Sequence, residues 1–312
     1  MMNKISKKYL IAALCIIIAL AIIIIKNYHN QRDPSAIYAK MAKDAGVVKK
    51  NISVDGYNIS YYERINRCER TLMLLHGISG NKNDFLKMAS YIPQNINIIL
   101  PDLAGHGENE KLPTIDYGIS AQAKLINKFL SQKGIDSIII GGNSMGGHIA
   151  LSFALRFPEK TKKLILINSA GISVKGNHAY SGYNKKIESK AEMIEALKYG
   201  YYSPPISTDR EIEMMISDFN RNREFIFNSV IPAIKNDTDY DLLPKINELK
   251  MPVLILWGRY DRVITLDVAR VFKEKLQNSY LVTINNSAHC PQNESPEEIS
   301  IQILSFINDD YK

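Results

Sequence analysis

The stretch IIIGGNSMGGHIA, residues 138–150, restricts the fold of this chain more than any other feature of its sequence. A run of isoleucines ends in two glycines, a lone serine follows, and after two further glycines the apolar residues return at helical spacing. This pattern predicts a buried strand that turns sharply at Ser144 into a helix beginning at Met145. Gly142 and Gly146 stand two positions from the serine, where side chains would clash in so tight a turn. The turn presents the serine hydroxyl at the end of a sheet, beside a helix N-terminus that favours negative charge.

From residue 51 onward the chain alternates short apolar runs of strand length with segments of helical periodicity. This alternation predicts the α/β class, a mostly parallel sheet with helices on both faces. The turn Asp55-Gly56 joins two strands of an antiparallel hairpin at one edge. Asn83 is the expected N-cap of the first helix, and Gly134 ends the second. The expected strands cover residues 51–56, 57–65, 70–77, 96–103, 136–142, 163–168, 252–257 and 280–284, and the expected helices cover residues 83–92, 120–134, 145–156, 265–277 and 294–308.

Residues 172–236 interrupt the alternation, because they contain polar turns and helix-like stretches but no strand followed by a helix. Thr208 and Glu211 form the sequence pattern of a capping box, which marks the start of one such helix. We therefore predict an α-helical cap over residues 172–236 that lies on the carboxyl edge of the sheet. The α/β core then consists of residues 51–171 and 237–312.

The segment Tyr9–Ile25 holds 17 residues without a charge, and a cluster of three lysines precedes it. As a helix it would be about 26 Å long, close to the ~30 Å of a bilayer's hydrocarbon core. These features predict a single-pass membrane anchor within residues 1–30, with the rest of the chain in the periplasm or outside the cell. A cleaved signal peptide and a buried core helix are the alternatives. Residues 31–50 are expected to form a basic stalk.

The net charge of +7 belongs entirely to this N-terminal part. Residues 1–50 hold nine basic and two acidic residues, which leaves residues 51–312 electrically balanced. A balanced body has no electrostatic attraction for nucleic acid. The expected partner of the N-terminal helix is a membrane. Nothing in the sequence indicates an oligomeric state.

A nucleophilic serine requires a base, an acid that orients the base, and donors for the developing oxyanion. Of the six histidines, His289 alone follows the last predicted strand, which brings it to the same sheet edge as Ser144. Asp261 follows the preceding strand and reaches that edge as well. Asp267 is the nearest rival acid, but it stands at the start of a helix and is expected to cap it. We therefore predict a catalytic triad of Ser144, Asp261 and His289.

The oxyanion donors are predicted from the segment LLHGISGN, whose strand ends at His76-Gly77. The backbone N–H of Ile78 is placed to face the reacting carbonyl oxygen, and the N–H of Met145 supplies the second donor. The residues expected to brace the site without transferring protons are His76, Asp102, Gly105 and His106.

The three cysteines do not make a disulfide framework. Cys15 lies in the apolar segment, whereas Cys68 and Cys290 can pair only if the fold brings them together, and two free thiols are expected. No spacing of Cys and His indicates a metal site. Acyl transfer through a serine nucleophile requires neither a metal nor a cofactor.

In order and spacing, the motifs of residues 50–312 resemble those of the α/β-hydrolase superfamily. They are HGISG, PDLAGHG, GNSMGG, WGRYDRV and HCPQNESPEE. The apolar N-terminal segment together with GNSMGG looks most like membrane-associated monoacylglycerol lipases and the related bacterial lipases and esterases. This resemblance implies an α/β-hydrolase fold, Ser144 as nucleophile with Asp261 and His289 as its partners, and residues 172–236 as the cap.

The sequence thus predicts a membrane-anchored serine hydrolase that cleaves carboxylic esters, monoacylglycerol-like ones among them, through an acyl-enzyme. Hydrolases that cleave carbon–carbon bonds of aromatic ring-fission products form an alternative on the same residues, since GNSMGG is also common among them. Those enzymes typically carry a tryptophan after the catalytic histidine, where this chain has Cys290. A non-catalytic ligand-binding protein is the alternative from another class, which an intact nucleophile, acid and base disfavour.

Overall fold

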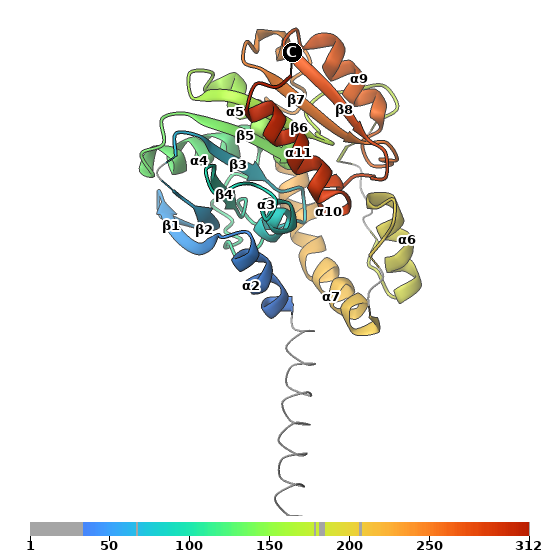
Figure 1. Cartoon of the computed structure of the whole chain (residues 1–312). Helices are drawn as coiled ribbons and strands as arrows, with labels where there is room; N and C mark the ends of the chain where they lie inside the picture. Colours follow the sequence, from blue (N-terminus) through green and yellow to red (C-terminus); the bar gives the residue numbers. More distant parts are fainter. Residues whose placement is uncertain (1–33, 67, 178, 181–184, 206–207, 312) are drawn as a thin grey trace, which may run out of the picture.

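The protein is built on one sheet of eight strands (Figure 1). The computed structural model describes residues 34–311 apart from residues 67, 178, 181–184 and 206–207. Along the sheet the order is β1 (Val48–Val54), β2 (Tyr57–Arg64), β4 (Asn97–Pro101), β3 (Thr71–Leu75), β5 (Ile138–Asn143), β6 (Thr161–Ile167), β7 (Val253–Gly258) and β8 (Ser279–Ile284). The pairs β1–β2 and β2–β4 are antiparallel and all others are parallel. The predicted α/β class with a mostly parallel sheet is confirmed.

Helices cover both faces of this sheet. They are α2 (Pro34–Asp44), α3 (Leu86–Ala89), α4 (Ile119–Gln132), α5 (Met145–Arg156), α6 (Lys190–Gly200), α7 (Asp209–Phe225), α8 (Ile231–Lys235), α9 (Leu266–Lys275), α10 (Pro291–Glu294) and α11 (Pro296–Ile307), with the short turns η1 (Lys82–Phe85), η2 (Ile226–Val230) and η3 (Ile246–Glu248). Helices α4, α5 and α9 pack on one face, whereas α2, α3 and α11 pack on the other.

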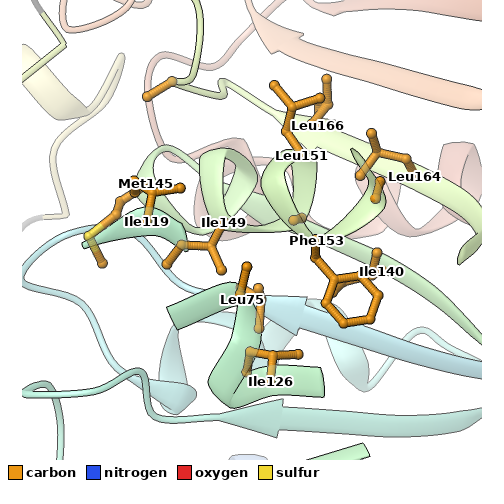
Figure 2. Close-up of a cluster of buried hydrophobic side chains, with 14 of the residues drawn as sticks. Leu75, Ile119, Ile126, Ile140, Met145, Ile149, Leu151, Phe153, Leu164 and Leu166 are labelled. Atoms are coloured by element: carbon orange, nitrogen blue, oxygen red, sulfur yellow. The ribbon is translucent and has the colours of Figure 1, made fainter. Parts of the chain in front are cut away.

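Strands β3, β4, β5 and β7 are buried at every position because both of their faces are covered. On β6, Leu164 and Leu166 join the core on one face, whereas Ile165 and Ile167 join the core on the other. Figure 2 shows the first of these cores, in which Phe153 of α5 lies against the strands. A continuous apolar run in the sequence therefore corresponds to a strand that is buried on both sides.

The hairpin at the sheet edge forms as predicted. Asp55 has φ 50° and Gly56 has φ 82°, so both residues of the turn adopt the left-handed conformation that two-residue hairpins require. The strands pair from Val54 opposite Tyr57 to Val48 opposite Glu63.

The first predicted helix is shorter than expected, and its cap is a different asparagine. The segment folds as the 3-10 turn η1 followed by the single turn of α3. Asn81, not Asn83, is the N-cap, because its side chain accepts a hydrogen bond from the Asn83 N–H at 2.9 Å. Asp84 completes a capping box by accepting from the Asn81 N–H at 3.3 Å.

The last predicted helix, over residues 294–308, forms as α11, and the short helix α10 precedes it. Helix α10 ends at Glu294, and α11 begins at Pro296, with Ser295 between them in a non-helical conformation. Proline has no N–H to continue a helix and disfavours a helical conformation in the residue before it, which accounts for the break.

The basic stalk expected over residues 31–50 is not a free linker in its described part. Residues from Pro34 form α2, and Ala42, Ala45 and Val47 are buried in the core beneath it. The Arg64 guanidinium donates to the Ala45 carbonyl at 2.6 Å. Most of this segment therefore belongs to the catalytic body. The apolar segment before it lies outside the described residues, and none of the helices from residue 34 onward is long and apolar enough to cross a bilayer.

The insertion between β6 and β7 contains the helices α6, α7, η2 and α8 and, among its described residues, no strand, while its residues 172–177 and 185–189 form loops and turns. The Thr208–Glu211 capping box at the start of α7 forms as predicted. In Figure 1, α6 and α7 project from the body beside α10. The two helices enclose a small apolar cluster of their own, in which Ile187, Met193 and Ile212 are buried.

Candidate active site

Ser144 occupies the predicted turn between β5 and α5 with φ 56° and ψ −118°, backbone angles that are strained for any residue with a side chain. Neighbouring backbone holds it there. Its N–H donates to the Ile167 carbonyl at 3.1 Å, and its own carbonyl accepts from the N–H groups of His148 and Ala170 at 3.1 Å each. The strain is therefore imposed by the ends of β6 and α5, as is common at functional sites.

The glycines around Ser144 are required by close backbone contacts. A Cβ on Gly142 would lie 2.4 Å from the carbonyl carbon of Gly146, and a Cβ on Gly146 would lie 2.0 Å from the carbonyl oxygen of Leu75. Both distances are well inside van der Waals contact. The turn can therefore approach the end of β3 only with glycine at these positions, as the sequence predicts.

The two predicted oxyanion donors, Ile78 and Met145, belong to the loop after β3 and to the start of α5. Met145 is the first residue of α5, where backbone N–H groups have no acceptor within the helix. Ile78 follows Gly77, and a Cβ on Gly77 would lie 3.3 Å from the Cβ of Ser144. The loop after β3 and the start of α5 thus meet at the serine.

Asp261 and His289 are brought together by the ends of β7 and β8. The Nδ1 of His289 lies 2.8 Å from Oδ2 of Asp261, whose side chain is fully buried. The other carboxylate oxygen accepts from the N–H groups of Val263 and Ile264 at 2.7 and 2.9 Å. With the carboxylate fixed in this way, the His289 ring is oriented through Nδ1, which leaves Nε2 available for chemistry. Among the contacts of the described residues, no hydrogen bond joins the Ser144 hydroxyl to His289.

Two asparagines that the sequence reasoning missed hold these loops together. Asn168, at the end of β6, donates to Asp261 Oδ2 at 2.6 Å and to the Ala288 carbonyl at 3.2 Å, and its Oδ1 accepts from the Gly258 N–H. Asn143 donates to the His289 carbonyl at 2.9 Å. The only signal in the sequence is a polar residue directly after, or at the last position of, an apolar strand.

The other histidines near the site are buried and engaged. His76 accepts at Nε2 from the Leu103 N–H at 3.0 Å, and burial lowers its pKa to about 4. Burial, with the neighbouring His76, lowers the pKa of His106 to about 3. His148 contacts the Tyr180 hydroxyl at 2.8 Å and the Asp239 carbonyl at 2.6 Å, and its pKa is lowered to about 4 by burial. All three are therefore neutral near pH 7 and bound to neighbours.

The loop after β4 is braced by a buried ion pair. Asp102 accepts from the Lys82 ammonium at 2.7 Å, and both side chains are almost fully inaccessible to solvent. The same carboxylate accepts from the backbone N–H groups of Lys82 and Glu108 at 2.7 and 2.9 Å. Gly105 adopts φ 73° against the Phe225 ring. These contacts agree with the bracing role predicted for Asp102 and Gly105.

Asp267 does not cap α9, contrary to expectation. The N-cap of that helix is Thr265, which makes no side-chain capping bond, and Asp267 is exposed and paired with Arg270 at 2.6 Å. The described cysteines, Cys68 and Cys290, are free thiols as expected. In the part of the chain that the structure describes, no cluster of three or more His, Cys, Asp or Glu side chains is arranged to hold a metal ion.

The family model of the α/β-hydrolase fold matches residues 70–296, about three quarters of the chain. The protein therefore belongs to the α/β-hydrolase family. Lipase 3 of Moraxella sp. (strain TA144) is 27% identical over 266 residues, which cover 83% of this chain and 84% of that protein. Monoacylglycerol lipase ABHD6 of Mus musculus is 24% identical over 259 residues, covering 76% of this chain and 75% of that protein.

A further relative and a solved structure are also similar to this chain. A 2-hydroxy-6-oxononadienedioate/2-hydroxy-6-oxononatrienedioate hydrolase of Paraburkholderia phymatum is 26% identical over 262 residues, covering 79% of this chain and 90% of that protein. The crystal structure of a membrane phospholipase A, described as a bacterial virulence factor, superimposes with a TM-score of 0.83 at 23% identity. It covers 97% of this chain and 98% of that chain, which shows that the two proteins share a fold. The relatives support a hydrolase of the lipase and esterase type.

Proposed function

We propose that this protein hydrolyses carboxylic esters through a covalent acyl-enzyme, with Ser144 as nucleophile, His289 as general base and Asp261 as the acid that orients it. The observation that carries the proposal is the 2.8 Å contact between Asp261 and His289 at the same sheet edge as the strained turn at Ser144. A serine held between glycines, a histidine and a buried carboxylate at one edge form the arrangement that acyl transfer requires.

In the proposed reaction the Ser144 hydroxyl attacks the ester carbonyl while Nε2 of His289 accepts its proton. The carbonyl oxygen becomes an oxyanion, which the N–H groups of Ile78 and Met145 stabilise. His289 then returns the proton to the departing alcohol, and the acyl group remains on the serine. A water molecule gives its proton to His289 and attacks the acyl carbon, which releases the acid and restores the serine. Asp261 stabilises the imidazolium in both steps.

We further propose that the substrate is a single-chain lipid ester of the monoacylglycerol type. The names of Lipase 3 and of monoacylglycerol lipase ABHD6 support this class. The insertion, residues 172–236, is the proposed cap, and it presents apolar and aromatic groups such as Tyr199 and Tyr202 at its surface. Each buried methylene of an acyl chain contributes about 0.8 kcal/mol, so a few methylenes against such a surface give a strong preference.

Attachment to a membrane through the apolar segment Tyr9–Ile25, with the body in the periplasm or outside the cell, is part of the same proposal. It rests on the length and charge pattern of that segment. Carbonate washing of membranes from cells that make the full chain tests it, since an anchored protein stays in the pellet. Release by the wash would contradict the anchor.

Cleavage of carbon–carbon bonds in ring-fission products is the second candidate, which the similarity to the Paraburkholderia phymatum hydrolase favours. The experiment that separates the candidates measures kcat/KM on p-nitrophenyl esters of graded length, on monoacylglycerols and on a ring-fission dienoate. A fluorophosphonate probe is applied in parallel, with Ser144→Ala as the control. Labelling of Ser144 together with ester hydrolysis supports the proposal. A kcat/KM on the dienoate a hundredfold above that on every ester supports the second candidate. A folded protein that is neither labelled nor active supports the non-catalytic ligand-binding protein.

A further inference from the structure

The end of helix α6 in the insertion is joined directly to the loop that carries His289. The backbone N–H of His289 donates to the carbonyl of Gly200, the last residue of α6, at 3.0 Å. This contact links residues that are 89 positions apart in the chain. The proposed catalytic base is therefore attached to the insertion as well as to Asp261.

Glu294 completes this connection with both of its carboxylate oxygens. Oε1 accepts from the N–H groups of Tyr202 and Ser203 at 2.7 and 3.0 Å. Oε2 accepts from the N–H of Ala288, the residue before His289, at 2.7 Å. Three backbone N–H donors from two segments thus converge on one carboxyl group, so this side chain clamps the insertion to the histidine loop.

Side chains of the same insertion segment contact both loops. The Tyr201 side chain lies beside the Cys290 thiol, whose pKa is raised by burial. The Tyr202 ring stacks on the ring of Tyr260, the residue before Asp261, with centroids 4.6 Å apart. Residues 200–203 thus touch the chain next to both partners of the proposed triad.

We propose that Glu294 is a positioning residue, which holds His289 in its reactive place by fastening the histidine loop to residues 200–203 of the insertion. This inference rests on the proposed function, in which His289 is the base. The hydrogen bond to Asp261 fixes Nδ1, but the His289 ring can still rotate about that hydrogen bond. The position of the backbone at residues 288–289 therefore determines where Nε2 points. A shift of about 1 Å in a catalytic group can cost on the order of 100-fold in rate.

The test compares Glu294→Gln with a matched control, Asp237→Asn. Asp237 also accepts from three donors, the Ser120 N–H and hydroxyl and the Asp239 N–H, and it joins the chain after the insertion to α4. Each substitution keeps the shape of the side chain and replaces one oxygen with an amide nitrogen. Because Glu294→Gln sets that nitrogen against backbone N–H groups at the histidine loop, we expect kcat to fall about 10- to 100-fold with KM changed less than about twofold. Labelling of Ser144 by fluorophosphonate should slow by a similar factor. Asp237→Asn should leave kcat unchanged, while its loss of Tm should be comparable to that of Glu294→Gln.

A second variant, Ser203→Pro, removes one N–H donor in an exposed loop and leaves the carboxylate intact, so it serves if Glu294→Gln does not fold. We expect it to lower kcat by a smaller factor, again without raising KM. Unchanged kcat in the folded variants, or a rise in KM alone, overturns the positioning role. Ser144→Ala distinguishes failure of the proposed function from failure of the positioning role. Full activity in Ser144→Ala rejects the proposed function. Loss of activity in Ser144→Ala together with a normal kcat in Glu294→Gln rejects only the positioning role of Glu294.

Discussion

The sheet edge and the insertion differ in how firmly each is packed. Strands β5 and β7 are buried at every position, and large apolar cores lie on both sides of them. In the described part of the insertion, the cluster around α6 and α7 has three buried members, Ile187, Met193 and Ile212. Ile194, Tyr199 and Tyr202 are 40%, 61% and 49% exposed. The residues proposed to make and break bonds therefore stand on the densely packed part of the molecule, and those proposed to select the substrate stand on the less densely packed part, where local opening costs less free energy.

This difference in packing predicts that a substitution at the sheet edge can abolish activity while the protein still folds. Ser144→Ala should lower ester hydrolysis by a factor on the order of 10⁶, while the far-ultraviolet circular dichroism and Tm stay close to those of the unmodified protein. The backbone strain at Ser144 is held by neighbouring main chain, so the side chain is not needed to maintain it. Retention of more than a tenth of the activity would mean that the nucleophile lies elsewhere.

Asp261→Asn should cost less, roughly 10⁴-fold in kcat, because an amide holds the wrong tautomer of His289. The substitution also places an amide against the buried Asn168 side chain, so a modest loss of Tm is expected. Asp267→Asn is the matched control on the nearby exposed helix start and should leave kcat unchanged. Equal losses in the two variants would show that the acid is misassigned.

A matched pair of isoleucines tests the difference in packing itself. Ile165 is fully buried in the sheet, whereas Ile212 is buried only in the small cluster of the insertion. Replacing Ile165 with alanine should lower the free energy of unfolding by about 2–5 kcal/mol. The same change at Ile212 should cost less and should alter the acyl-chain preference more. Urea unfolding and kcat/KM on graded esters measure both effects, and equal unfolding costs would contradict the distinction.

Acid should weaken the core through its buried histidines. Burial lowers the pKa of His148 from 6.5 to about 4, so between these values the unfolded chain binds more protons than the folded one. The free energy of unfolding is therefore highest above pH 6.5 and falls as the pH decreases towards 4. His148→Gln should reduce this slope, which urea unfolding at several pH values measures. An unchanged slope in that variant would show that other groups control the acid response.

The strands and the serine turn could be read from the sequence because their signals are local. Apolar runs bounded by glycine or polar residues located β3, β4 and β5 to within a few residues, and the helix after Ser144 begins and ends as predicted. The glycine requirement at Gly142 and Gly146 is also local, since it arises from the turn itself. The N-cap of the first helix has a local signal of the same kind, but it is Asn81, two residues before the predicted Asn83.

The polar side chains that meet at the site, and the contacts that support them, depend on the tertiary fold. Asn168, Asn143 and Glu294 make bonds to the Asp261 and His289 loops across long stretches of chain, and those bonds exist because the strand order places β5, β6, β7 and β8 side by side. The docking of α2 on the body has the same origin, since a polar, basic segment carries no local sign of the surface that will cover it. The amino-acid order sets periodicity and turns over a few residues, whereas contacts between distant loops depend on how the whole sheet is assembled.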